Sequence, residues 1–289
     1  MPPSPRAEPR RAVEAAEDLD ADLLRSWSLP VESDGDKYSR GTVLVIGGSA
    51  MTPGAVLLAG RAALRMGAGR LQIATVRDIA IPVGVALPEA MVLPFDTVPE
   101  DRVRESIGMA DAVVVGPGLV GDDVAAIVDI VLRGVRTQST VVLDAAAIMV
   151  FGQLNPVLVE RTRSRLVLTP NRQVARSLIT VPFTVDADVL REGARTTGAV
   201  LTSFGDVHAP DGRRWRTSAE TLGLGTSGSG DVLAGLVAGA AARCADRAQA
   251  ACWATFAHLE AGRRLESRVG PLGYLATDLL GEVPTCLPR

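Results

Sequence analysis

From Gly41 onward, short apolar runs alternate with longer segments in which alanine and leucine recur at helical spacing. Residues 42–46 (TVLVI) are apolar throughout and precede a glycine turn, as expected for a strand buried on both faces. Residues 55–66 have the period of a helix, which the glycines of 67–69 would end. Residues 70–76 read as the next strand. These segments together predict a β-α-β unit.

The same alternation continues toward the C-terminus. Further strands that end in polar or turn residues are predicted over 111–119, 140–146 and 165–171. Further helices are predicted over 122–135, 231–243 and 246–266. Residues 199–217 differ, because they contain short strands joined by turn residues. We expect this segment to form a hairpin at an edge of the sheet.

Strands that alternate with helices predict a three-layer α/β/α sandwich around a mostly parallel central sheet. With 289 residues and 47% hydrophobic content, the chain is long enough to bury the core of one large domain. We expect that single domain to cover 19–289. Residues 1–18, rich in proline and arginine, are expected to form a disordered N-terminal lead.

Composition and charge narrow the classes of function. The formal net charge is −3, so neither a nucleic acid nor a membrane surface is expected as a partner. No apolar run approaches the length of about 18 residues that a membrane span requires. The three cysteines match no metal or redox spacing and indicate a reducing, cytoplasmic environment. The two histidines are far apart, so a histidine-based metal site is not expected.

Residues 226–235 (TSGSGDVLAG) carry the strongest chemical signal. Gly228 and Gly230 allow backbone N–H groups to approach a phosphate closely. A helix that begins near Asp231 adds unpaired N–H groups and the positive end of its dipole. Asp231 would lie beside the phosphate, where it could accept a proton from an attacking hydroxyl. The alternative is that Asp231 is an ordinary helix N-cap.

Other polar turns follow the predicted strands, and ligands of such folds bind beyond the carboxyl ends of the strands. Asp144 at the end of one strand could hold a metal or a substrate hydroxyl, or only cap the chain locally. His258 lies between apolar residues of a predicted helix and is expected in the core or an interface, whereas His208 is expected to be exposed. The glycine turn after 42–46 fits neither a dinucleotide fingerprint nor a P-loop, which leaves a nicotinamide-dependent oxidoreductase as a weak alternative.

Several segments in this order and spacing resemble the ADP-dependent NAD(P)H-hydrate dehydratases of the ribokinase-like superfamily. The matching segments are 41–75, 86–92, 113–119, 141–148, 168–171, 226–235 and 273–284. The resemblance implies a ribokinase-like sandwich and a lyase that repairs hydrated NADH or NADPH. In that reaction ADP phosphorylates the hydroxyl on the nicotinamide ring, and loss of phosphate restores the double bond. The resemblance also implies that Mg²⁺ bridges the phosphates, and it leaves ATP as an alternative to ADP.

The resemblance assigns roles to individual residues. Asp231 is implied as the catalytic base and as a substrate contact. Ala55, Gly118 and Asn171 are implied to line the substrate pocket. The implied nucleotide contacts are Ser203, Phe204, Gly205, Gly228, Ser229 and Gly230. No side chain is implied as a metal ligand. Relatives of this kind often form symmetric oligomers, so a homo-oligomer is expected by analogy.

Several positions depart from the pattern of the family, and three of them belong to the expected pocket. Asn171 stands where a histidine is usual, Phe204 where a lysine is usual, and Ala146 where an aspartate is usual. Lys37 is the only lysine of the chain, so no lysine downstream replaces the lost one. Each lost charge-assisted contact is worth about 1.5–3 kcal/mol. Two alternatives therefore stay open: a different small-molecule kinase of this fold, and a nucleotide-binding protein with weak or no catalytic activity.

Overall fold

The structure is a computed structural model that describes residues 15–30, 36–178, 186–218, 221–243 and 246–288. Most of the expected N-terminal lead, residues 1–14, lies outside the described residues. The last residues of that segment form a short strand, β1 (Glu17–Asp18), which pairs with β10. Within the described residues, regular structure therefore begins before residue 19, at β1.

Ten strands within the described part of the chain form one sheet, in the order β1-β10-β9-β8-β7-β6-β5-β2-β3-β4. Its other members are β2 (Thr42–Ile46), β3 (Arg70–Thr75), β4 (Ala90–Pro94), β5 (Ala112–Val115), β6 (Thr140–Leu143), β7 (Leu166–Leu168), β8 (Val200–Ser203), β9 (Asp206–His208) and β10 (Arg214–Arg216). Strands β2 to β8 pair in parallel, and only β8-β9-β10 is antiparallel. The mostly parallel sheet is thus confirmed.

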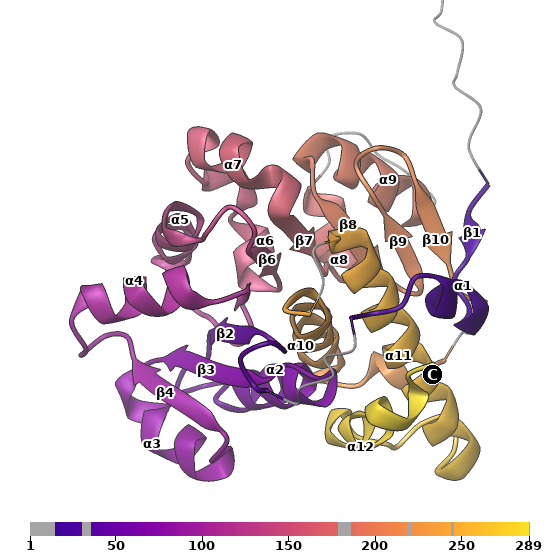
Figure 1. The fold of residues 1–289 in the computed structure, drawn as a ribbon, viewed down its shortest axis with the longest axis horizontal. Helices are drawn as coiled ribbons and strands as arrows, with labels where there is room; N and C mark the ends of the chain where they lie inside the picture. Colours follow the sequence, from indigo (N-terminus) through magenta and orange to yellow (C-terminus); the bar gives the residue numbers. More distant parts are fainter. Residues whose placement is uncertain (1–14, 31–35, 179–185, 219–220, 244–245, 289) are drawn as a thin grey trace, which may run out of the picture.

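Helices cover both faces of the sheet, which confirms the three-layer sandwich (Figure 1). One layer contains α1 (Ala21–Ser26), α2 (Gly54–Arg65), α3 (Arg77–Ala86), α10 (Ser229–Ala241), α11 (Arg247–Arg268) and α12 (Ala276–Cys286). The other contains α4 (Glu100–Met109), α5 (Val124–Gly134), α6 (Ala146–Met149), α7 (Pro156–Thr162), α8 (Arg172–Ser177) and α9 (Asp186–Thr197). Alternate residues of each strand face opposite layers: Val43 and Val45 join one core, Leu44 and Ile46 the other.

The predicted β-α-β unit is confirmed to within one or two residues by β2, α2 and β3. The predicted hairpin corresponds to β8, β9 and β10, with only the two-residue β1 beyond it at that edge. The sequence analysis did not predict β4, which forms the opposite edge, although its five residues (AMVLP) are all apolar. Only Leu93 of β4 is buried and the strand ends in a proline, as is usual at an edge of a sheet.

His208 is buried, which corrects the expectation that it is exposed. Only 3% of the residue is accessible, because β9 lies between β8 and β10 and packs against α9. Burial, followed by the positive charges of Arg214 and Arg191, lowers the pKa of His208 to about 3. His208 is therefore a neutral residue of the interior at physiological pH.

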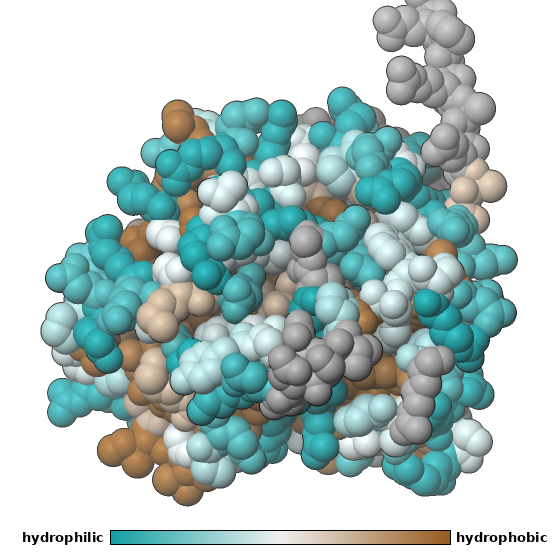
Figure 2. Space-filling view, viewed as in Figure 1, coloured by the Kyte–Doolittle hydropathy of each residue, from teal (hydrophilic) through white to brown (hydrophobic). Residues whose placement is uncertain are grey.

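Figure 2 shows a largely hydrophilic surface on which apolar atoms gather over α3, at the lower left. Ile81 and Val85 of this helix are 79% and 78% exposed. No described helix combines the length and the apolar character that crossing a bilayer would need.

Candidate active site

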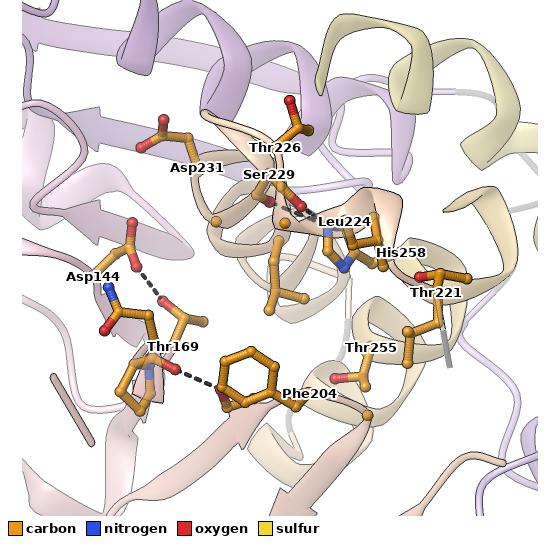
Figure 3. A pocket seen from close by; sticks show the side chains of 18 of the residues that line it. Asp144, Thr169, Phe204, Thr221, Leu224, Thr226, Ser229, Asp231, Thr255 and His258 are labelled. Carbon is orange, nitrogen blue, oxygen red and sulfur yellow. Dashed lines mark hydrogen bonds between the residues drawn. The ribbon is translucent and has the colours of Figure 1, made fainter. Parts of the chain in front are cut away.

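A cavity of about 900 Å³ opens beyond the carboxyl ends of the central strands, where the polar turns were expected to converge. Its wall contains Asp144 after β6, Thr169 after β7 and Ser203 at the end of β8. The start of α10 and one side of α11 close it from the other layer (Figure 3). The parallel topology therefore brings together turns that lie far apart in the sequence.

Most of the residues that the family resemblance implied lie in this wall. Those that line the cavity are Asn171, Ser203, Phe204, Gly205, Gly228, Ser229, Gly230 and Asp231. Ala55 and Gly118 are not in the lining. They pack against each other where α2 begins: a Cβ added to Gly118 would lie 2.9 Å from Cβ of Ala55 and 2.7 Å from the carbonyl oxygen of Thr52.

The start of α10 is built around Gly228. This residue is the N-cap, with a φ of 87°, and a Cβ added to it would lie 2.5 Å from Cδ1 of Leu58. The helix begins at Ser229, so Asp231 lies in the first turn. The alternative interpretation of Asp231 as the N-cap is therefore wrong. The amides of Gly230 and Asp231 have no intrahelical acceptor, as in the first turn of any α-helix, and are available to an anion.

Two carboxyl groups line the same side of the cavity (Figure 3). Asp144 is 5% exposed and accepts a hydrogen bond of 2.8 Å from Oγ1 of Thr169. Burial raises the pKa of Asp144 to about 6. Burial, and then the negative charge of Asp144, raise the pKa of Asp231 to about 7. A carboxylate with a pKa near neutrality is suited to act as a general base.

No three His, Cys, Asp or Glu side chains among the residues described form a cluster that could hold a metal ion. Asp144 and Asp231 are carboxylates within one cavity, and Mg²⁺ is commonly held by one or two carboxylates together with substrate phosphates and water. The donor set fits a metal that arrives with a nucleotide.

The turn between β8 and β9 places an aromatic side chain in the cavity wall. Phe204 and Gly205 have φ values of 50° and 82° and connect the paired residues Ser203 and Asp206. A two-residue turn with both φ values positive favours Asn-Gly, so phenylalanine is strained there. The side chain of Phe204 nevertheless stays 54% exposed and lines the cavity. Backbone strain of this kind is typical of functional sites.

Asn171 has a local structural role as well as a place in the wall. It is the N-cap of α8, and its Oδ1 accepts a hydrogen bond of 2.9 Å from the backbone N–H of Val174. Asparagine is a preferred N-cap residue, so Asn171 stabilises the start of α8.

Two polar residues of the wall carry no signal in the sequence pattern. His258 of α11 is buried, as expected, but it also lines the cavity, and its Nε2 lies 2.9 Å from Oγ of Ser229. Arg216 of β10 is the one arginine or lysine in the lining among the residues that the structure describes, with Nε 3.8 Å from Oδ2 of Asp206. Neither could be found from helical or strand periodicity, because folding alone brings them to the cavity.

Comparison with known proteins identifies the family. The family model for NAD(P)H-hydrate dehydratase matches residues 43–285. An ADP-dependent (S)-NAD(P)H-hydrate dehydratase of Xanthomonas campestris pv. campestris is 40% identical over 284 residues, which cover 93% of this chain and 95% of the relative.

Solved structures agree with this fold. A ribokinase-like superfamily protein from Enterococcus faecalis superposes with a TM-score of 0.81 at 24% identity, covering 96% of this chain and 97% of its own. The ADP/ATP-dependent NAD(P)H-hydrate dehydratase of Bacillus subtilis, co-crystallised with ATP and Mg²⁺, gives a TM-score of 0.77 at 23% identity, with coverages of 94% and 98%. The fold is therefore ribokinase-like, and the chain belongs to the NAD(P)H-hydrate dehydratase family.

Proposed function

We propose that this chain is an ADP-dependent dehydratase that restores hydrated NADH and NADPH. The observation that carries the proposal is the placement of Asp231. Its carboxyl group, with a pKa of about 7, lies in the first turn of α10 beside amides that can bind an anion. The 40% identity to a protein named for this activity, over nearly the full length of both chains, supports the same assignment.

ADP would occupy the cavity with its phosphates at the start of α10 and its base against the apolar part of the wall. The apolar part contains Phe204, Leu222, Leu224 and Leu259. Ser203 and Gly205 flank Phe204 at the same end of the cavity. ATP has the same base and ribose, so it remains the alternative nucleotide. Mg²⁺ bound with the nucleotide would neutralise phosphate charge, with Asp144 and Asp231 as the available carboxylates.

The reaction follows from these positions. Ionised Asp231 takes the proton of the ring hydroxyl, and that oxygen attacks the β-phosphoryl group of ADP, so that AMP leaves. The amides at the start of α10 stabilise the negative charge of the transferred group. The C–O bond then breaks, phosphate leaves with the bonding electrons, and loss of a ring proton restores the double bond. The hydrate would lie beside Asp231, with Asn171 at the rim and Ala55 and Gly118 behind the start of α10.

Hydrated NADH, incubated with the protein and ADP, ATP or no nucleotide in the presence of Mg²⁺, tests this proposal. We expect the reduced-nicotinamide absorbance to return with ADP, together with equal amounts of AMP and phosphate. No return with either nucleotide at high protein concentration would overturn the proposal. A thermal shift with ADP in the absence of turnover would favour the alternative of a nucleotide-binding protein without activity, since a ligand of the native state raises its stability.

We further propose that the chain is a single domain, which covers the expected 19–289 and also includes β1, and that it acts in the cytoplasm and forms a homo-oligomer. The continuous sheet supports one domain. Cys252 and Cys286 are buried and free, as is usual in a reducing compartment. The exposed apolar side chains of Ile81 and Val85 on α3 offer surface for self-association. Light scattering of the purified protein would measure its oligomeric state.

A further inference from the structure

One ring nitrogen of His258, Nδ1, has no hydrogen-bond partner among the described residues. The residue is 8% exposed, and its Nε2 lies 2.9 Å from Oγ and 3.1 Å from the carbonyl oxygen of Ser229. Nδ1, by contrast, makes no hydrogen bond within the described part of the chain, and it is not among the buried polar atoms without a partner. His258 lines the cavity, so Nδ1 is open to it. Figure 3 shows the ring in the cavity wall beside Ser229.

The contacts of Nε2 determine which nitrogen carries the proton. A backbone carbonyl oxygen can only accept a hydrogen bond, so Nε2 must be the N–H donor toward Ser229. Burial lowers the pKa of His258 to about 4, so the ring is neutral at pH 7. In a neutral ring whose Nε2 is protonated, Nδ1 is an acceptor. The cavity wall therefore presents, at Nδ1 of His258, an acceptor that a ligand with an O–H or N–H group can satisfy.

The neighbour of His258 indicates which part of a nucleotide that group belongs to. Ser229 is the first residue of α10 and belongs to residues 228–231, where the phosphates are proposed to bind and which we call the phosphate-binding loop. Phe204 and Leu222 form the wall proposed for the base. The ribose joins phosphates to base, and its hydroxyls are O–H donors. We infer that Nδ1 of His258 accepts a hydrogen bond from a ribose hydroxyl of the nucleotide while Nε2 holds Ser229 in the phosphate-binding loop.

This inference rests on the proposed function for the identity of the ligand, and it adds a binding residue for the sugar. A bound nucleotide would cover Nδ1, and an acceptor that is covered without a partner is costly, so a nucleotide that lacks the contacted hydroxyl should bind less tightly. The inference thus predicts selection for ribonucleotides over one of the two deoxyribonucleotides.

The test measures Kd for ADP, 2′-deoxy-ADP and 3′-deoxy-ADP by calorimetry with the full chain. We expect the native protein to bind one deoxynucleotide about tenfold more weakly than ADP, as one hydrogen bond predicts. His258→Phe removes both nitrogens and should bring that ratio close to one. If His258→Phe does not fold, His258→Leu serves for the same comparison.

His208→Phe is the matched control, since His208 is equally buried and lies outside the cavity lining. It should keep the native preference for ADP. Equal affinities of the native protein for all three nucleotides would overturn the inference and leave the proposed function standing, as would a preference that persists in His258→Phe. A native protein that binds no ADP at all would overturn the proposed function, and the role of His258 with it.

Discussion

Asp144 and Asp231 interact electrostatically on one side of the cavity, and the charge of Asp144 is the second cause, after burial, of the raised pKa of Asp231. They come from different elements, the end of β6 and the first turn of α10. Because two carboxylates in a site of low polarity resist ionising together, one favours protonation of the other. The charge of Asp144 therefore favours the protonated form of Asp231, whose pKa lies near neutrality.

Replacing Asp231 by asparagine should abolish turnover and leave ADP binding largely intact. Asparagine keeps the shape of the side chain and the amides of α10, but it cannot accept the proton of the ring hydroxyl. The measurements are recovery of reduced nicotinamide and a thermal shift with ADP. Near-native turnover in Asp231→Asn would exclude a role as the base.

The rate should depend on the ionisation of Asp231. In the native protein we expect kcat/KM to rise with pH with an apparent pKa of about 7. Asp144→Asn removes the neighbouring negative charge, so the midpoint should move to lower pH. The position of the midpoint is the readout, because the substitution can also change the maximal rate. An unchanged midpoint would show that Asp144 does not act on Asp231.

Asp144→Asn should also stabilise the folded protein at alkaline pH. The pKa of Asp144 is raised to about 6 in the folded state from an unfolded value of 3.8. The preference of the folded protein for the protonated carboxyl group therefore adds to the free energy of unfolding in full below pH 3.8, and this contribution is lost as pH rises through about 6. Asparagine can still accept from Thr169 and carries no charge. Asp144→Asn should therefore raise the free energy of unfolding at pH 8 by about 2–3 kcal/mol, from the size of the pKa shift.

Urea unfolding of both proteins at pH 8 and pH 4.5 measures this effect. The advantage of Asp144→Asn should shrink at the lower pH, where the native carboxyl group is mostly protonated. A variant less stable than the native protein at pH 8 would mean that the carboxylate contributes more through contacts than it costs through burial.

Two glycines of the phosphate-binding loop should respond differently to alanine. Gly228→Ala should lower the free energy of unfolding by about 1–3 kcal/mol, because φ is 87° and the new Cβ would meet Leu58 at 2.5 Å. Gly230→Ala adds a Cβ with nothing within 4 Å, so it should fold with native or slightly higher stability. The added methyl group at residue 230 lies at the proposed anion site and should weaken ADP binding.

Thermal unfolding with and without ADP separates these two effects. Gly230→Ala is the informative variant, since its folded state is expected to be unperturbed. Native ADP affinity in Gly230→Ala would argue against phosphate binding at this turn.

Phe204→Asn should weaken ADP binding and raise the free energy of unfolding. Asparagine suits the first position of a turn with both φ values positive, so the free energy of unfolding should rise by about 1 kcal/mol. The aromatic wall beside the proposed base would be lost, and stacking of a base on an aromatic ring is worth about 1–3 kcal/mol. We expect the Kd for ADP to rise about tenfold. A Kd that stays native would show that Phe204 does not contact the base.

Local patterns of apolar and polar residues were sufficient to predict much of the fold. The run Thr42–Ile46 and the helix that follows it were predicted closely, because strands buried on both faces are apolar at every position. β4 and the burial of His208 were not predicted, since both depend on which strands become neighbours. The position of Asp231 within the first turn of α10, two residues after the helix begins, was also missed, because the left-handed Gly228 begins α10 earlier than composition indicates.

The sequence by itself determined the alternating architecture, the glycine loop with its aspartate, and the family. Only the tertiary structure decided that Asp144 acts on Asp231, that Phe204 faces the cavity from a strained turn, and that His258 presents a free acceptor beside Ser229. The physical reason is that pKa values and hydrogen-bond partners depend on distances between residues far apart in the chain. Such distances exist only once the sheet has brought the strand ends together.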